Sequence, residues 1–458
     1  MILNRPLTPE DKKSSQKNTL IFNCINGLSY MCLGETLIIL LAVKMAMPDT
    51  LITILGSMQH IGFILLPLGV WRAAKVGAAQ CQADFWICRN IAALMAAAAS
   101  IISLYSPMLS WIILLFASFT FYGCRAAGVV LCQPLIGELT SDHDRAQFIG
   151  KCGTAFYLFG VISLLFISFV LNLHDSIYLL CGVIILGAAL GITASGFVRR
   201  IKETGELRKS ASEKLLPKLK ENLRDQDIIR QLFAGFWATF SVVTILPIAI
   251  LFIKKGYGFS NTKSLFFSSM MFIACFTISY LTGKFAAKKG PRLLLICGIC
   301  AHIGTAFCWI LAPYTGAWAT IPLSLILFFL FGSAIVMCDN ALHGYFLMTI
   351  PKNKQVLTAV LINILRGVCA GVGGMLLASG LLKLSQYLVK FVLPYVQKVL
   401  PSATEQITIY KLYFLMLLPF LIVGFCQILK LKTVITTFKE KYGDDAVKEA
   451  VRPQNNKV

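Results

Sequence analysis

Charged residues are scarce in this chain of 458 amino acids: Asp, Glu, Lys and Arg together make up 14% of it, while 57% is hydrophobic. In soluble domains about a quarter of the residues are charged. The mean hydropathy is +0.75. Apolar runs of about twenty residues recur, the length that crosses about 30 Å of hydrocarbon. Because lipid offers backbone groups no hydrogen-bonding partner, each run must be helical. These features exclude a soluble protein and predict an all-α polytopic membrane protein.

Enzyme motifs are missing as well. The chain contains no H-E-x-x-H, no G-x-S-x-G and no Walker sequence, so we expect neither an enzyme nor an ATP-driven pump, and no metal or cofactor. No compact soluble region could present a basic patch, so the net charge of +21 does not predict nucleic-acid binding. The fifteen cysteines fall inside apolar segments or at predicted cytoplasmic ends, where disulfides are not expected.

The apolar runs form two sets of six predicted spans. The first set covers residues 19–44, 51–71, 85–104, 108–133, 148–171 and 177–197. The second set covers residues 231–253, 264–282, 293–312, 318–347, 356–382 and 409–429. We therefore expect a bundle at 19–197, a bundle at 231–429, and a linker of mixed charge at 198–230 between them.

Basic residues predict the orientation. Connectors after even-numbered spans are rich in Lys and Arg, whereas the connectors between spans 3 and 4 and between spans 9 and 10 carry no charge. Because basic loops stay in the cytoplasm, both tails, 1–18 and 430–458, and the linker are expected there. Residues 383–401 are expected to form an external amphipathic insert that contacts membrane lipids. A bacterial inner membrane and a monomer are the expected setting.

The two halves contain similar sequences. "WRAAKVG" at 71–77 recurs as "KFAAKKG" at 284–290, and "YGCRAAG" at 122–128 aligns without gaps to "FGSAIVM" at 331–337. Each pair occupies the same position within its half. The halves are therefore expected to be two structural repeats.

The loops after spans 2 and 8 carry a pattern typical of one family. Gly283, Lys288, Gly290 and Arg292 match G-x-x-x-D-R/K-x-G-R/K-R/K, with Ala287 in place of the acid. The first half keeps Lys75 and Gly77, and the connector after span 4 keeps Arg145. With its twelve spans, the chain resembles the major facilitator superfamily. The resemblance implies two pseudo-symmetric six-helix bundles and a gating role for these loop residues. Span 5 lacks the proline of the family's antiporters.

Ionisable residues deep in the spans are candidates for function, because a buried charge is costly. Glu35 lies in span 1 and Arg125 in span 4. The resemblance to sugar/proton symporters implies that this acid faces this arginine. Proton coupling, a permanent ion pair and substrate binding by Glu35 all remain open. Asp339 and Arg366 are expected at similar depths of about 18 to 22 Å, either as a second coupling pair or as a locked interhelical pair.

Several polar residues within the spans are predicted to hydrogen-bond a solute at mid-depth. Each of them can instead be an interhelical contact, and a histidine among them, His60, can serve either a proton path or packing. The set is Asn23, Asn26, Gln59, His60, Asn340, His343 and Asn363.

These observations predict a secondary active transporter that moves a small polar organic solute by alternating access, in symport with protons. Sodium is the alternative coupling ion. Two other functions remain open: an efflux antiporter driven by protons, and a sensor or scaffold of transporter shape that moves no solute.

Overall fold

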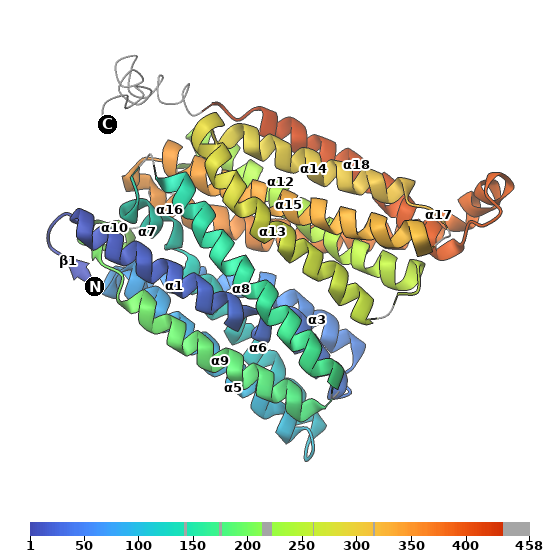
Figure 1. Cartoon of the computed structure of the whole chain (residues 1–458), viewed down its shortest axis with the longest axis horizontal. Helices are drawn as coiled ribbons and strands as arrows, with labels where there is room; N and C mark the ends of the chain where they lie inside the picture. The colour runs from blue at the N-terminus through green and yellow to red at the C-terminus, as the bar shows by residue number, and fades with distance from the viewer. Residues whose placement is uncertain (142–143, 174–175, 213–221, 260, 315–316, 434–458) are drawn as a thin grey trace.

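The protein is described by a computed structural model that covers residues 1–141, 144–173, 176–212, 222–259, 261–314 and 317–433. Its helices form two bundles, one blue to green and one yellow to red in Figure 1. Among the described residues, eleven helical segments are long and apolar enough to cross a membrane. The interrupted segment 49–76 takes the place of the second predicted span. The all-helical membrane architecture is thus confirmed, and a count of twelve spans is consistent with it.

The first bundle contains six spans, several of them built from more than one helix. They are α1 (Pro9–Leu33) with α2 (Glu35–Lys44); α3 (Asp49–Ile61), the 3-10 turn η1 (Gly62–Leu65) and α4 (Leu66–Val76); α5 (Ala78–Ile102); α6 (Pro107–Val129) with α7 (Cys132–Leu139); α8 (Arg145–Leu173); and α9 (Ile177–Arg199). The connector that follows contains α10 (Gly205–Ser212).

The second bundle repeats this arrangement. It consists of α12 (Gln226–Leu251) with the π-helical turn η2 (Phe252–Gly256); α13 (Asn261–Lys289); α14 (Pro291–Leu311); α15 (Ala317–Thr349); α16 (Lys352–Ile364), the π-helix η3 (Leu365–Val372) and α17 (Gly373–Val399); and α18 (Glu405–Leu429). The sequence expected as an insert therefore continues α17 as far as Val399.

Two glycines show that the repeated loops adopt the same backbone. Gly77, between α4 and α5, has φ 90° and ψ 169°, and Gly290, between α13 and α14, has φ 84° and ψ 158°. A positive φ of this kind is readily adopted only by glycine. The loops at 71–77 and 284–290 thus end on equivalent conformations, which agrees with two structural repeats.

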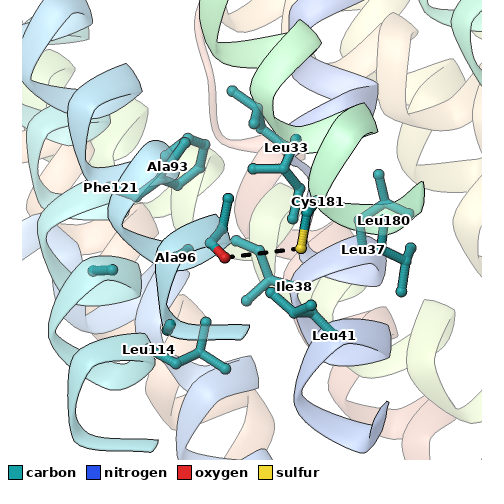
Figure 2. Packing of buried hydrophobic residues seen from close by; sticks show 14 of the residues in the cluster. Leu33, Leu37, Ile38, Leu41, Ala93, Ala96, Leu114, Phe121, Leu180 and Cys181 are labelled. Atoms are coloured by element: carbon teal, nitrogen blue, oxygen red, sulfur yellow. Dashed lines mark hydrogen bonds between the residues drawn. The ribbon is translucent and has the colours of Figure 1, made fainter. Parts of the chain in front are cut away.

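Small side chains allow the helices of the first bundle to approach closely. Ala93 and Ala96 of α5, Ile38 of α2 and Cys181 of α9 belong to one buried apolar cluster (Figure 2). Because lipid is as apolar as leucine, close van der Waals packing holds such helices together. The alanine-rich face of α5 therefore allows its close approach to α9.

The bundles meet along two seams. In the first, α8 crosses α13, and the Ser279 hydroxyl donates to the Gly150 carbonyl at 3.1 Å. A Cβ added at Gly150 or at Gly283 would lie within 3 Å of a backbone oxygen of the other helix. In the second, η3 packs on α3 and η1, with Gly367 against the Phe63 ring. Glycine thus permits the closest approach at both seams.

One end of the bundles carries Met1, Leu139, Arg199 and Leu429, and we call it the N-terminal face (left in Figure 1). Here β1 (Ile2–Leu3) pairs in parallel with β2 (Glu203–Thr204). The Met1 amine also donates to the carbonyl of Ile201 at 2.6 Å. The beginning of the chain is therefore joined to the connector that follows the sixth span.

Candidate functional site

A cavity of about 220 Å³ lies between the bundles, on the side of the N-terminal face. Helices α1, α5, α7 and α8 contribute to it from the first bundle, and α15 contributes from the second. Its polar side chains belong to Thr19, Asn23, Gln82, Tyr157, Asp339, Asn340 and His343. Three residues predicted from the sequence to bind a solute, Asn23, Asn340 and His343, thus share this cavity with Asp339.

Asp339 pairs with Arg366 across α15 and η3. The Arg366 Nη2 donates to Asp339 Oδ1 at 2.6 Å, and Nε donates to the Thr239 hydroxyl of α12 at 2.8 Å. The side chain of Asp339 remains 35% exposed, and that of Arg366 is 20% exposed. Arg366 belongs to a π-helix, a distortion that is frequent at functional sites. The acid of this pair therefore faces the cavity while its cationic partner is anchored in the second bundle.

The remaining predicted solute-binding residues lie outside the cavity lining. Asn26 accepts a hydrogen bond from Trp86 Nε1 at 3.0 Å, and Asn363 donates to the Ala359 carbonyl of its own helix. His60 is buried against Gly371 at the second seam, and Gln59 is half-buried beside it. In this structure, these four residues therefore do not contact the cavity.

Arg125 lies behind the wall of the cavity. Its guanidinium stacks over the Tyr30 ring at 4.9 Å, and its Nη1 lies 3.4 Å from the Tyr30 hydroxyl. Tyr30 in turn packs against Phe156, a cavity-lining residue, at 5.6 Å between ring centroids. Glu35 begins α2 directly after a break in the helix at Gly34. The side chain of Glu35 lies outside the described residues, and its pairing with Arg125 stays a prediction.

The loop residues predicted to act in gating have individual contacts. Arg145 donates to the Leu347 carbonyl of the other bundle at 3.1 Å. Arg292 donates to the Leu429 carbonyl, and the Lys75 ammonium lies 3.7 Å from the Trp71 ring centroid. Gly77 and Gly290 form the turns described above, and Gly283 lies in the first seam. Arg145 and Gly283 therefore join the bundles, while the side chain of Lys288 lies outside the described residues.

The start of α5, next to the loop at 71–77, is capped by an acid from the connector that follows the sixth span. The buried Glu203 carboxylate accepts from the backbone N–H groups of Ala78 and Ala79 at 2.8 and 3.1 Å. These donors are unpaired at the start of a helix, and the helix dipole favours a negative charge there. Burial nevertheless raises the pKa of Glu203 to about 7, and the two N–H donors offset this only in part.

Two residues of this region were not predicted from the sequence. Arg89 of α5 is fully buried and stacks on the Trp86 ring at 4.6 Å. Tyr157 of α8 lines the cavity. A single arginine within span 85–104 is a clear signal of a costly buried charge, so Arg89 could have been found. Tyr157 could not, because nothing distinguishes it from other aromatic residues in a span.

Two repeated helical bundles with a polar, ion-paired cavity between them define the class of polytopic transport proteins with internal repeats. The sequence model of the Major Facilitator Superfamily matches residues 19–374. The chain belongs to this superfamily. Membership points to a transporter rather than an enzyme.

Solved structures with the same fold belong to several transporters. The E. coli xylose transporter XylE, in a partially occluded inward-open conformation, has a TM-score of 0.61 at 12% identity, over 97% of this chain and 100% of that one. A bacterial homologue of the iron transporter ferroportin, outward-facing, has 0.62 at 12%, over 91% and 98%. The human organic anion transporter MFSD10 has 0.63 at 14%, over 92% and 100%. These identities establish the fold alone. No curated protein matches the chain.

Proposed function

We propose that this protein is a secondary active transporter that moves a small polar organic solute by alternating access, in symport with protons. The observation that carries the proposal is the Asp339–Arg366 pair, which opens onto the cavity between the two repeats. Ligand pockets for drug-sized molecules measure about 300 to 1,000 Å³. A cavity of about 220 Å³ therefore favours a small solute.

The pair supplies a coupling mechanism. Asp339 is held by Arg366 through a charge-assisted hydrogen bond. When the bundles rock, Asp339 can exchange Arg366 for a proton, so that movement of the bundles is coupled to proton uptake and release. One proton that crosses 100 mV contributes about 2.3 kcal/mol to solute accumulation.

We also place the N-terminal face in the cytoplasm. Helix ends on this face carry Arg72, Lys75, Arg145 and Arg292, and basic residues that flank the spans are retained on that side. In this orientation the cavity lies on the cytoplasmic side of the membrane's mid-depth. Protons that enter with the solute then move inward along the potential.

The test is flux into proteoliposomes that contain the full chain. Xylose, uridine and gluconate are offered under an acid-outside gradient, while an internal pH dye reports proton entry. We expect at least one solute to accumulate together with protons. In Asp339→Asn, accumulation is expected to fall at least about tenfold, whereas exchange of labelled for unlabelled solute continues, because exchange requires no net proton movement.

Glu405→Gln is the matched control, because Glu405 is an exposed acid at the opposite end of the bundles. It should transport like the unmodified protein. Unchanged proton-driven accumulation in Asp339→Asn would overturn the coupling role. Accumulation that follows a sodium gradient and not a proton gradient would identify sodium as the coupling ion. Solute exit that accompanies proton entry would favour the antiporter. No flux of any solute would favour a sensor or scaffold.

A further inference from the structure

The first bundle contains a buried cation whose hydrogen-bonding capacity is largely unused. Arg89 is 0% exposed, and its Nη2 lies 3.4 Å from both Asn26 Oδ1 and Ser29 Oγ. Within the described residues, Nε and Nη1 have no acceptor. These two atoms carry three of the five N–H donors of an arginine. A buried donor without an acceptor costs about 1 to 3 kcal/mol. The Arg89 guanidinium therefore has room for a hydrogen-bond acceptor that the described residues do not supply.

Arg125 provides a second positive charge in the same region. Arg89 of α5 stacks over the Phe121 ring of α6 at 5.3 Å, and Phe121 lies one turn before Arg125 on α6. The contacts of Arg125 are with Tyr30, and Tyr30 packs on Phe156 of the cavity wall. The rings of Tyr30 and Phe156 thus lie in succession between this arginine and the cavity.

The mid-depth charges do not balance. Among described residues, the second bundle pairs Arg366 with Asp339, whereas the first bundle holds Arg89 and Arg125. If Glu35 is counted as a carboxylate from the sequence, three arginines still face two acids. Each proton taken up by an acid increases the excess. A buried excess of positive charge is costly in a membrane and calls for an anion.

We propose that the transported solute is a small organic anion whose carboxylate or phosphate group binds Arg125, with Arg89 as the second positive charge. This inference rests on the proposed transport function. Arginine suits both groups, because its planar fork binds carboxylate and phosphate oxygens through two parallel hydrogen bonds. Displacement of the Tyr30 and Phe156 rings would open Arg125 to the cavity. Asn23 and Gln82 then remain for the uncharged part of the solute.

The first experiment measures ligand-induced shifts in the melting temperature of the purified full chain. The probes are two pools of two- to six-carbon compounds: carboxylates, sugar acids and sugar phosphates in one, and their neutral counterparts in the other, for example gluconate and glucose 6-phosphate against glucose. We expect stabilisation by members of the anionic pool. Stabilisation by neutral compounds alone, or by no anion, overturns the proposal. Comparison of gluconate with glucose 6-phosphate distinguishes a carboxylate site from a phosphate site.

Variants separate anion binding from packing. Arg125→Gln should weaken binding of the stabilising anion at least about tenfold, which is the loss expected for one hydrogen bond to a charged group. Arg89→Gln should lower the preference for that anion over its neutral counterpart, and Arg89→Lys should restore part of it, because the charge is kept. Lys390→Gln, at an exposed lysine of α17, is the control and should leave binding unchanged.

The decisive measurement is the ratio between the binding constant of the stabilising anion and that of its neutral counterpart. A purely structural arginine would alter the stability of the protein without altering this ratio. If Arg89→Gln fails to fold, Arg125→Gln decides alone. An unchanged ratio in every folded variant overturns the proposal. Flux distinguishes it from the proposed function: an anion that binds without being transported contradicts transport, whereas accumulation of neutral solutes only keeps transport and contradicts the anion site.

Discussion

At the residue scale, the pair formed by Asp339 and Arg366 illustrates what distance along a helix can predict. Counting residues from the turn at Pro351 places both at similar depths on antiparallel helices, at about 1.5 Å of rise per residue. The structure brings Arg366 Nη2 to 2.6 Å from Asp339 Oδ1. Depth was therefore accessible from the sequence. The third partner, Thr239, was not, because its contact depends on how α12 packs against η3.

The energetic coupling between Asp339 and Arg366 can be measured. Arg366→Gln leaves a carboxylate in the membrane without its cation, and Asp339→Asn leaves the reverse, so each should lower the melting temperature. The double variant removes both charges and should be less destabilised than the sum of the two, with a coupling of about 0.5 to 3 kcal/mol. A thermal-unfolding cycle measures this. Additive effects would mean that the two side chains do not interact.

Polar side chains that hydrogen-bond to a backbone carbonyl of their own helix limit what polarity alone can predict about a binding site. Asn363 looks like a solute ligand in the sequence, but its amide donates to the Ala359 carbonyl one turn away. Asn23 makes the same kind of bond, to Thr19, and yet lines the cavity. Asn23 and Asn363 make the same hydrogen bond within their own helices. Only the packing of the bundles therefore decides which of the two side chains reaches the cavity.

At the element scale, the membrane helices depart from regular geometry where hydropathy gives no warning. The first span breaks at Gly34, with ψ 164°, and the eleventh contains the π-helix η3. Apolar length predicts the existence of a span, because the hydrocarbon thickness sets it. It is insensitive to a local change in hydrogen bonding, since the apolar composition stays the same. Both candidate coupling residues nevertheless lie at these irregularities: Glu35 follows the break at Gly34, and Arg366 belongs to η3.

The η3 seam gives a prediction with an internal control. A methyl group at Gly371 would collide with the His60 ring of α3, whereas one at Gly373 meets nothing within 4 Å. Gly371→Ala should therefore force the bundles apart, at a cost of about 1 to 3 kcal/mol, and should slow flux. Gly373→Ala should do neither. Melting temperature and proteoliposome flux measure both. Equal effects of the two substitutions would show that this contact is unimportant.

At the scale of the whole molecule, the N-terminal face joins segments that are far apart in the chain. The Glu203 carboxylate caps α5, and Thr204 donates to the Glu138 carboxylate at the end of α7. The two bundles, the linker and the order of the spans follow from hydropathy and repeats. These polar contacts do not, because a connector of mixed charge allows many pairings and the tertiary fold selects one. Glu203 thus ties this connector to the start of α5.

Glu203 also makes the stability of this face depend on pH. Its pKa is raised to about 7 by burial, whereas an unfolded glutamate titrates near about 4.3. Between these values the folded protein keeps a proton that the unfolded chain releases, so stability falls as pH rises. The contribution is present in full below about pH 4 and is lost by about pH 7, and it amounts to about 4 kcal/mol.

Glu203→Gln cannot ionise, and its amide oxygen can still accept from one of the two N–H groups at the start of α5. The variant should therefore lose less stability than the unmodified protein when the pH is raised from 5 to 8. Glu206→Gln, an exposed position in the same connector, should retain the original pH dependence. Melting temperatures measured across this range decide the matter. If Glu203→Gln and the unmodified protein show the same slope, the buried carboxylate is not the group that titrates, and the link between Glu203 and the start of α5 contributes no pH dependence to this face.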